Sequence, residues 1–118
     1  MNDKQDIHPI YHNPFGVAFQ WKKNDVKDTN KVQLVFRDTG LLLSRKELTD
    51  FQKSIKCTIK SSTLCKNCPQ DESRRALLLD TPAPQVTLAV SPKELNVVDD
   101  LVEGTLFQLQ LDHLLYGS

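Results

Sequence analysis

The chain has no long hydrophobic run and no excess of charge of either sign. No stretch of about 18 apolar residues occurs, so the sequence predicts no membrane-spanning helix. Residues 1–6 are polar and lack the apolar segment of a secretory signal, so we expect no signal peptide. The formal net charge is zero and the pI is near 6.8. This balance argues against a dedicated nucleic-acid binder, because such proteins usually carry a basic excess.

Cysteine is scarce, with only Cys57, Cys65 and Cys68. An odd number does not make a secreted disulfide framework, and a reducing cytoplasm fits best. Cys65 and Cys68 have the C-x-x-C spacing that lets two thiolates bind one zinc ion, and Cys57 would be a third ligand. The fourth ligand would be one of the histidines: His8, His12 or His113. A single pair is a weak zinc signal, so free thiols without a metal cofactor are our first interpretation. A zinc- or thiol-dependent regulatory protein is the alternative.

Catalytic motifs are also missing. The chain has no P-loop and no G-x-G-x-x-G, H-E-x-x-H or G-x-S-x-G pattern. His8 and His12 are four residues apart, but Pro9 between them argues against a shared helical face. The neighbouring carboxylates Asp99 and Asp100 are expected to be solvated on the polar side of a helix. The sequence therefore predicts a non-enzymatic protein and identifies no catalytic residue.

What the chain does contain is a short unit that occurs twice. Residues 41–48 read Leu-Leu-Leu-Ser-Arg-Lys-Glu-Leu, and residues 88–95 read Leu-Ala-Val-Ser-Pro-Lys-Glu-Leu. Each contains Ser-x-x-Glu, a capping box that begins a helix by satisfying two backbone N–H groups reciprocally. The apolar positions that follow also correspond. We therefore expect a duplicated strand–strand–helix (ββα) unit over residues 32–56 and 75–115.

Hydrophobic periodicity predicts the individual elements. Strands are expected at 16–22, 32–37, 41–43, 76–79 and 85–90, although 70–79 is also helical by propensity alone. A tight turn over 38–40 would use Gly40 for a positive φ. One helix should start at Ser44 and fray over 57–60, followed by a loop over 61–73. The other should run from Ser91 to about Leu115, with a kink available at Gly104.

These elements predict an α+β domain. Short connections favour an antiparallel sheet of about five strands, shared by both units, with the two helices on one face. Residues 1–15 would be an extended N-terminal arm or an edge segment, and residues 16–118 a single domain. The aromatic side chains among the strands are expected in the core rather than as stacking platforms: Phe15, Phe19, Trp21 and Phe36.

Two features indicate a protein partner. Residues 45–75 contain eight basic residues (Lys or Arg) and four acidic residues (Asp or Glu). Residues 76–118 contain one basic residue and six acidic residues. Solvated helix faces or electrostatic pairing, within the chain or between subunits, would explain this asymmetry. The second helix also carries more apolar residues than one buried stripe needs: Leu106, Phe107, Leu109, Leu111, Leu114 and Leu115. The surplus would meet another copy of the chain, or the N-terminal arm with Ile10, Tyr11 and Phe15 would cover it. The sequence therefore predicts that the chain is a protein-binding or homodimeric module.

The motifs also resemble a known family. The aromatic strand, the V-x-L-x-F-x-x-T-G-L-L-L-S segment, and the L-A-V-S-P-K-E-L segment are similar to those of small uncharacterised proteins from Bacteroidetes-type bacteria. The likeness covers residues 11–115 and concerns caps, turns and core. A cysteine pair often lies in the first-strand region of that family, whereas residues 20–24 here contain none. The family has no established activity, so the resemblance implies no site.

Overall fold

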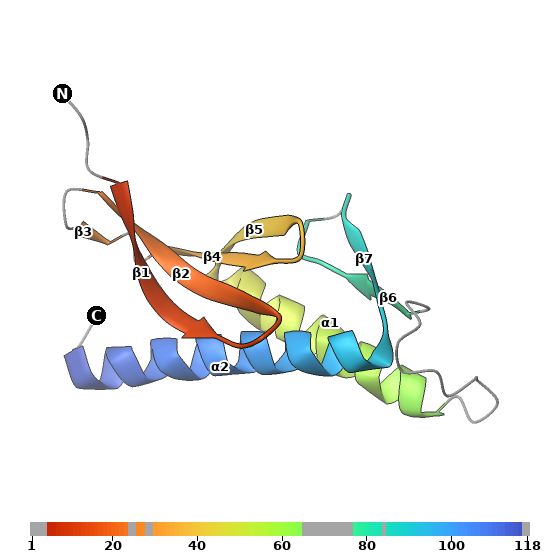
Figure 1. The fold of residues 1–118 in the computed structure, drawn as a ribbon. Coiled ribbons are helices and arrows are strands. Elements are labelled where there is room, and N and C mark those ends of the chain that lie inside the picture. Colours follow the sequence, from red (N-terminus) through yellow and green to blue (C-terminus); the bar gives the residue numbers. More distant parts are fainter. Residues whose placement is uncertain (1–4, 24–25, 28–29, 65–76, 84, 117–118) are drawn as a thin grey trace.

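The computed structural model describes residues 5–23, 26–27, 30–64, 77–83 and 85–116. Its strands and helices follow in chain order (Figure 1): β1 (Gln5–His12), β2 (Gly16–Lys23), β3 (Val26–Lys27), β4 (Lys31–Phe36), β5 (Thr39–Ser44), α1 (Arg45–Leu64), β6 (Leu77–Asp80), β7 (Thr87–Val90) and α2 (Pro92–Tyr116). The α+β class is as the sequence predicts, and the chain segment expected to be an arm or an edge contributes strand β1.

The main sheet has five strands, all antiparallel. Its order is β1-β2-β4-β5, and β3 pairs with the end of β2. Residues paired across the strands point to the same face, so the register defines an inner face. Ala18, Leu34 and Leu41 lie side by side on that face and are buried, with exposed fractions of 0%, 0% and 7%. This row is the sheet's contribution to the core.

The expected sharing of one sheet by both units is wrong. Within the described residues, strands β6 and β7 pair only with each other, in a separate two-stranded antiparallel sheet. The N-terminal strands β1 and β3 supply the remaining places in the main sheet. The inner residues of the β6–β7 hairpin, Leu79, Leu88 and Val90, are nevertheless buried in the common core. Burial of this apolar face therefore does not require hydrogen bonds to the main sheet.

Both helices lie on one side of the main sheet (Figure 1). Helix α2 runs along β1 and β2, and α1 lies beside α2 and reaches from β5 to β6. Their buried residues follow the helical periodicity that the sequence predicts, with Leu48, Phe51 and Ile55 from α1 and Leu95, Val98 and Val102 from α2. The core therefore lies between one layer of strands and one layer of helices.

Both helices begin with the predicted capping boxes. In α1, the Ser44 N–H donates to Glu47 Oε1 at 2.9 Å and the Glu47 N–H donates to Ser44 Oγ at 3.1 Å. In α2, the Ser91 N–H donates to Glu94 Oε1 and the Glu94 N–H to Ser91 Oγ, both at 3.0 Å. The hydrogen bond that Glu47 accepts from the Ser44 backbone is the main cause that lowers the pKa of Glu47 below its ordinary value.

The end of α1 differs from the expectation. The helix does not fray at Cys57 but continues to Leu64. Ile59 packs against the core, and the Thr58 hydroxyl donates to the Ser54 carbonyl at 2.9 Å. These contacts outweigh the weak helix propensity of the segment, as tertiary packing commonly does. The predicted loop over 61–73 therefore begins at least four residues late, and residues 65–73 lie outside the described residues.

The turn between β4 and β5 also differs from the expectation. The loop is Arg37–Asp38, and Gly40 lies within strand β5. The positive φ of the turn, 52°, belongs to Arg37. A positive φ at the first of two loop residues is the pattern of a type II′ hairpin, in which glycine is preferred. Arg37 also ion-pairs with Glu94 at 3.8 Å and lies 6.0 Å from the centre of the Phe15 ring.

Replacement of Ser44 by alanine should lower the free energy of unfolding by about 1 kcal/mol, because it removes the cap of α1. It should also move the pKa of Glu47 back up. A carboxyl whose pKa is lowered by folding stabilises the native state above its unfolded pKa, and this contribution disappears as the pH falls through the folded pKa. Urea unfolding at pH 7 and at acidic pH measures both effects. Ser54→Ala, in the middle of α1, is the matched control. It should leave the pKa of Glu47 unchanged and raise the free energy of unfolding by a few tenths of a kcal/mol, because alanine has the higher helix propensity.

Candidate functional site

The N-terminal strand is fastened to α2 by polar contacts. The Tyr11 hydroxyl donates to Asp100 Oδ2 at 2.9 Å, and this hydrogen bond is the main reason that the pKa of Tyr11 is raised. Asn13 Nδ2 donates to the Val97 carbonyl at 2.9 Å and to Asp100 Oδ2 at 3.0 Å. Gly104 makes the approach possible, since a Cβ there would lie 2.4 Å from the Tyr11 ring. The N-terminal segment thus covers α2 around residues 97–104.

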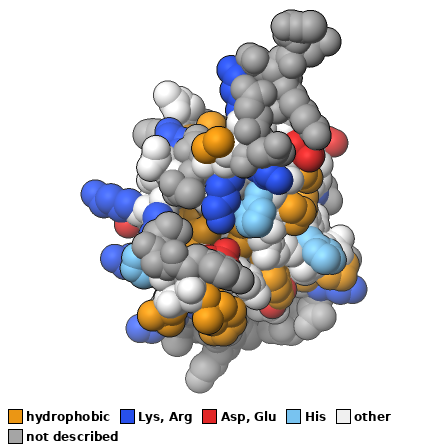
Figure 2. All heavy atoms as spheres, turned by 90° about the vertical axis from the view of Figure 1, so that its left-hand side faces the viewer, with side chains coloured by type: hydrophobic (Ala, Val, Ile, Leu, Met, Phe, Trp, Pro, Cys, Tyr) orange, Lys and Arg blue, Asp and Glu red, His pale blue; other side chains and the backbone are white. Residues whose placement is uncertain are grey.

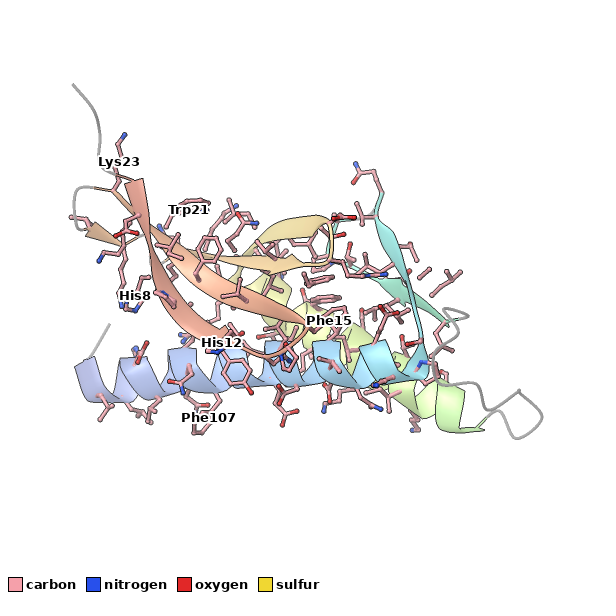
Figure 3. All side chains as sticks on the ribbon, in the orientation of Figure 1. His8, His12, Phe15, Trp21, Lys23 and Phe107 are labelled. Carbon is pink, nitrogen blue, oxygen red and sulfur yellow. The ribbon has the colours of Figure 1, made fainter. Side chains whose placement is uncertain are left out.

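The last turns of α2 carry an apolar surface that the N-terminal strand does not cover. Phe107, Leu114 and Leu115 are 61%, 73% and 64% exposed, and Leu111 between them is half-buried. Leu111 follows Phe107 by four residues, and Leu114 and Leu115 follow Leu111 by three and four residues, so all four side chains lie along one helical stripe. Phe107 points away from the sheet (Figure 3). We call these four residues the C-terminal stripe.

The outer face of the main sheet is apolar as well. Phe19 and Trp21 lie on this face, because their neighbours Ala18 and Gln20 occupy the inner face. Phe19 is nevertheless buried as expected, with an exposed fraction of 7%, whereas Trp21 is not. Their rings meet edge to face at 5.0 Å, and Trp21 Nε1 donates to Gln33 Oε1 at 3.2 Å. Trp21 remains 37% exposed and Leu42, from β5, 48% exposed. Of the four aromatic residues expected in the core, Phe36 is fully buried and stacks on the partly buried Phe15.

The residues proposed for a zinc site are not brought together in the described part of the chain. Cys57 is a free, exposed thiol on α1, and Cys65 and Cys68 lie outside the described residues. Among the described residues, no group of three or more His, Cys, Asp or Glu side chains could hold a metal ion. The zinc site therefore stays a prediction.

The histidines are distributed over two elements. His8 pairs with Gln20 and His12 with Val17, on opposite faces of the sheet, because the register shifts between Pro9 and Tyr11. A β-bulge of this kind redirects every side chain that follows it. His113 is exposed near the end of α2. Only His8 therefore shares the inner sheet face with Gln20.

Ion pairs join the basic and acidic segments of the chain. Lys56 of α1 donates to Asp99 at 2.9 Å and to Glu103 at 3.2 Å, both on α2. The hydrogen bond to Asp99, followed by that to Glu103, raises the pKa of Lys56. These contacts correspond to pairing within the chain, one of the explanations that the sequence left open for the charge asymmetry. They fix α1 against α2 at the surface of the helix layer.

A polar pocket opens at the end of the molecule where α2 finishes. Its enclosed volume is about 70 Å³, and about 490 Å³ when the space open to solvent is counted, so a ligand would be only partly enclosed. Six polar or charged residues line it: Gln20, Lys27, Asn30, Arg45, Asp112 and His113. Val32 and Leu109 supply apolar lining. Basic and histidine side chains gather on this end of the molecule, which Figure 2 shows from outside.

Sequence reasoning missed this pocket for a structural reason. Its polar residues come from β2, β3, the turn before β4, the start of α1 and the last turns of α2, so no spacing along the chain connects them. Only Gln20 carried a usable signal. It sits between the apolar residues Phe19 and Trp21 in a strand, on the face that also carries Ala18. A polar residue on a core-facing strand position indicates either a buried hydrogen bond or a site.

Comparison with known proteins finds no matching family model, no matching curated protein and no matching solved structure. The resemblance to the Bacteroidetes-type family therefore stays a prediction. Among the described residues, neither helix is both long and apolar enough to cross a lipid bilayer.

Proposed function

We propose that this chain is a non-enzymatic, cytoplasmic protein-binding module that self-associates through the C-terminal stripe. The observation that carries the proposal is the exposure of Phe107, Leu114 and Leu115 on one face of α2. Contiguous exposed apolar residues of this size are typical of interaction surfaces. The N-terminal strand, which was the other candidate to cover the surplus, packs one to three turns earlier on the helix.

The stripe suits a second copy of the same chain. Two α2 helices crossing antiparallel at Leu111 would set Phe107 of one copy beside Leu115 of the other, since both lie four residues from the crossing point. Such an isologous twofold contact is the commonest arrangement in homo-oligomers. Residues 104–115 carry one carboxylate, Asp112, and one histidine, His113, so two copies would meet without strong charge repulsion. A patch of four side chains is small, and we expect a weak, micromolar dimer.

Light scattering across a concentration series tests the proposal. The wild-type chain should approach a dimer mass as its concentration rises into the hundreds of micromolar, because weak association follows mass action. Phe107→Glu should remain a monomer at every concentration, since it places a carboxylate against the apolar side chain of Leu115 of the other copy. Circular dichroism should show that the variant keeps its fold, because the side chain is largely exposed.

Leu42→Glu is the matched control. Leu42 is also an exposed apolar residue, 48% exposed, but it lies on the outer face of the sheet rather than on α2. Its replacement should leave the dimer intact. A monomeric wild type throughout the series would contradict self-association, and a dimer lost in Leu42→Glu but kept in Phe107→Glu would move the interface to the sheet.

We also propose that the two strand–strand–helix segments are copies of one ancestral unit. The recurring Ser-Arg/Pro-Lys-Glu-Leu sequence and the near-equal geometry of the two capping boxes support this origin. The separate pairing of β6 with β7 is compatible with it, because each hairpin leads into its own helix. Superposition of residues 32–56 on 75–103 in an experimental structure, hairpin on hairpin and helix on helix, is the expected result. A hairpin that points to the opposite side of its helix would exclude it.

A further inference from the structure

We infer that the polar pocket at the end of α2 binds a small zwitterion, a molecule that carries a carboxylate and an ammonium on a short aliphatic body. Free α-amino acids with apolar side chains belong to this class. Three properties of the pocket support this: an amide that lines it without a hydrogen-bond partner among the described residues, opposite charges on opposing elements, and an apolar lining.

Gln20 gives the first indication of a ligand. The residue is only 4% exposed and lines the pocket. Among the residues that the structure describes, its side-chain amide makes no hydrogen bond, in contrast to Gln33 on the other face, which accepts from Trp21. The amide is not fully enclosed, since among the described residues the only fully buried side-chain atom without a partner is Asp99 Oδ1; it reaches the open space of the pocket instead. An amide at this position therefore suits an occupant that both accepts and donates hydrogen bonds.

The charges around Gln20 divide the pocket into two halves. Lys27 of β3 and Arg45, the first residue of α1, provide two cations. Asp112, in the last turns of α2, provides a carboxylate. Within the described part of the chain, the side chains of Lys27, Arg45 and Asp112 form no ion pair with one another, although all three line the same pocket. Each charge is consequently available to a ligand.

The helix dipoles reinforce this division. The N-terminus of α1 carries positive partial charge and the C-terminus of α2 negative partial charge. Arg45 marks the first of these ends, and Asp112 with His113 marks the second. A simple anion would gain from only one half of the pocket and meet repulsion from the other. A ligand with both charges gains from both, with its carboxylate towards Lys27 and Arg45 and its ammonium towards Asp112.

Val32 and Leu109 indicate which kind of side chain the ligand carries. Val32 is 2% exposed, and Leu109 is packed against the core. An aliphatic side chain of the ligand would lie against these two residues and remove apolar surface from water, at about 25 cal/mol per Å². A zwitterion with a branched aliphatic side chain combines all three properties, so we take L-leucine as the probe.

The test compares L-leucine with two molecules that each lack one of its charges. 4-Methylpentanoate keeps the carboxylate and the aliphatic body, and 3-methylbutylamine keeps the ammonium and the aliphatic body. Each is titrated to about 20 mM into the ¹⁵N-labelled protein, a range that covers millimolar dissociation constants. L-Leucine should shift the side-chain amide signals of Gln20 and the backbone signals near Arg45 and Asp112. The other two molecules should bind about tenfold more weakly, the loss expected when one charge-assisted hydrogen bond is missing.

Two substitutions locate the site. Asp112→Asn should lower the affinity for L-leucine about tenfold and leave the affinity for 4-methylpentanoate unchanged or slightly higher. Arg45→Gln should lower the affinity for both molecules, because both carry a carboxylate. The control is Asp38→Asn, an equal charge change in the exposed turn at the far end of β4, which should have no effect. Equal binding of L-leucine and 4-methylpentanoate, insensitive to Asp112→Asn, would overturn the zwitterion in favour of a simple anion. No shift at Gln20 with any of the three molecules would overturn the site.

Discussion

Replacement of Phe51 by alanine is expected to lower the free energy of unfolding by about 3–5 kcal/mol, the usual cost of truncating a buried phenylalanine. Phe51 is fully buried, with an exposed fraction of 0%, on the face of α1 that contributes to the common core. Truncation removes an apolar side chain from that core and leaves a cavity that rigid neighbours fill only partly. Since domains of this size are stable by about 5–15 kcal/mol, the variant should be close to unfolding at room temperature.

Phe107→Ala is the matched control for this prediction. The chemical change is the same, but Phe107 is 61% exposed on α2. The monomer should lose about 0.5 kcal/mol or less, as for most surface substitutions. Urea unfolding of both variants, at a concentration where the chain is monomeric, gives the two free energies. Similar losses in both variants would mean that the helix layer is not packed on the sheet as described.

The sequence predicts those parts of the fold that depend on local interactions. The capping boxes at Ser44 and Ser91 form as expected, because their donors and acceptors are three residues apart and need no tertiary partner. Propensity leaves residues 70–79 open between helix and strand, and the strand at 77–80 agrees with the interpretation that the comparison of the two halves favours. Local patterns therefore place most helices and strands to within a few residues.

What the sequence does not predict is how the hairpins pair. The alternation in β6 and β7 shows which side chains are buried, and Leu79 and Val90 are buried as expected. It does not show whether the strands' open edges bond to β5 or face solvent, because the same burial pattern satisfies both arrangements. The pairing of β1 with β2 was similarly hidden, although the segment was expected to be an arm or an edge, since Pro9 and the register shift after it interrupt any alternation in residues 5–12. Pairing of this kind depends on contacts between distant segments.

The candidate sites differ in the same way. The C-terminal stripe is predictable, because Phe107, Leu111 and Leu114 exceed what one buried helical face requires and a simple count along α2 reveals them. The polar pocket is not predictable, because Lys27, Arg45 and Asp112 meet only after β3, α1 and α2 are placed in space. Surfaces on one element are visible in a sequence, whereas a site between elements becomes visible only in the fold.

Replacement of Gly16 by alanine is the second change with a large expected effect, about 1–3 kcal/mol of destabilisation from overpacking. Gly16 lies in β2 directly opposite Phe36 of β4. A Cβ at Gly16 would lie 2.4 Å from the Val35 carbonyl oxygen and 2.7 Å from the Phe36 Cβ. These atoms belong to or adjoin the backbone of the neighbouring strand, so no side-chain rotation relieves the contact. The strands themselves must separate, which weakens the centre of the main sheet.

Gly40→Ala is the control, because Gly40 also lies in a strand that pairs with β4. The nearest atom to a Cβ at Gly40 is Gln33 Nε2, at 3.2 Å, the far end of a flexible side chain that can move away. Alanine also reduces the conformational entropy of the unfolded chain, which stabilises the native state by about 0.4–1 kcal/mol where the backbone conformation permits it. Thermal and urea unfolding should therefore show Gly16→Ala clearly destabilised and Gly40→Ala unchanged or slightly more stable. If both variants unfold alike, the close approach of β2 and β4 at Phe36 does not limit the packing of the sheet, and the steric argument for glycine at position 16 fails.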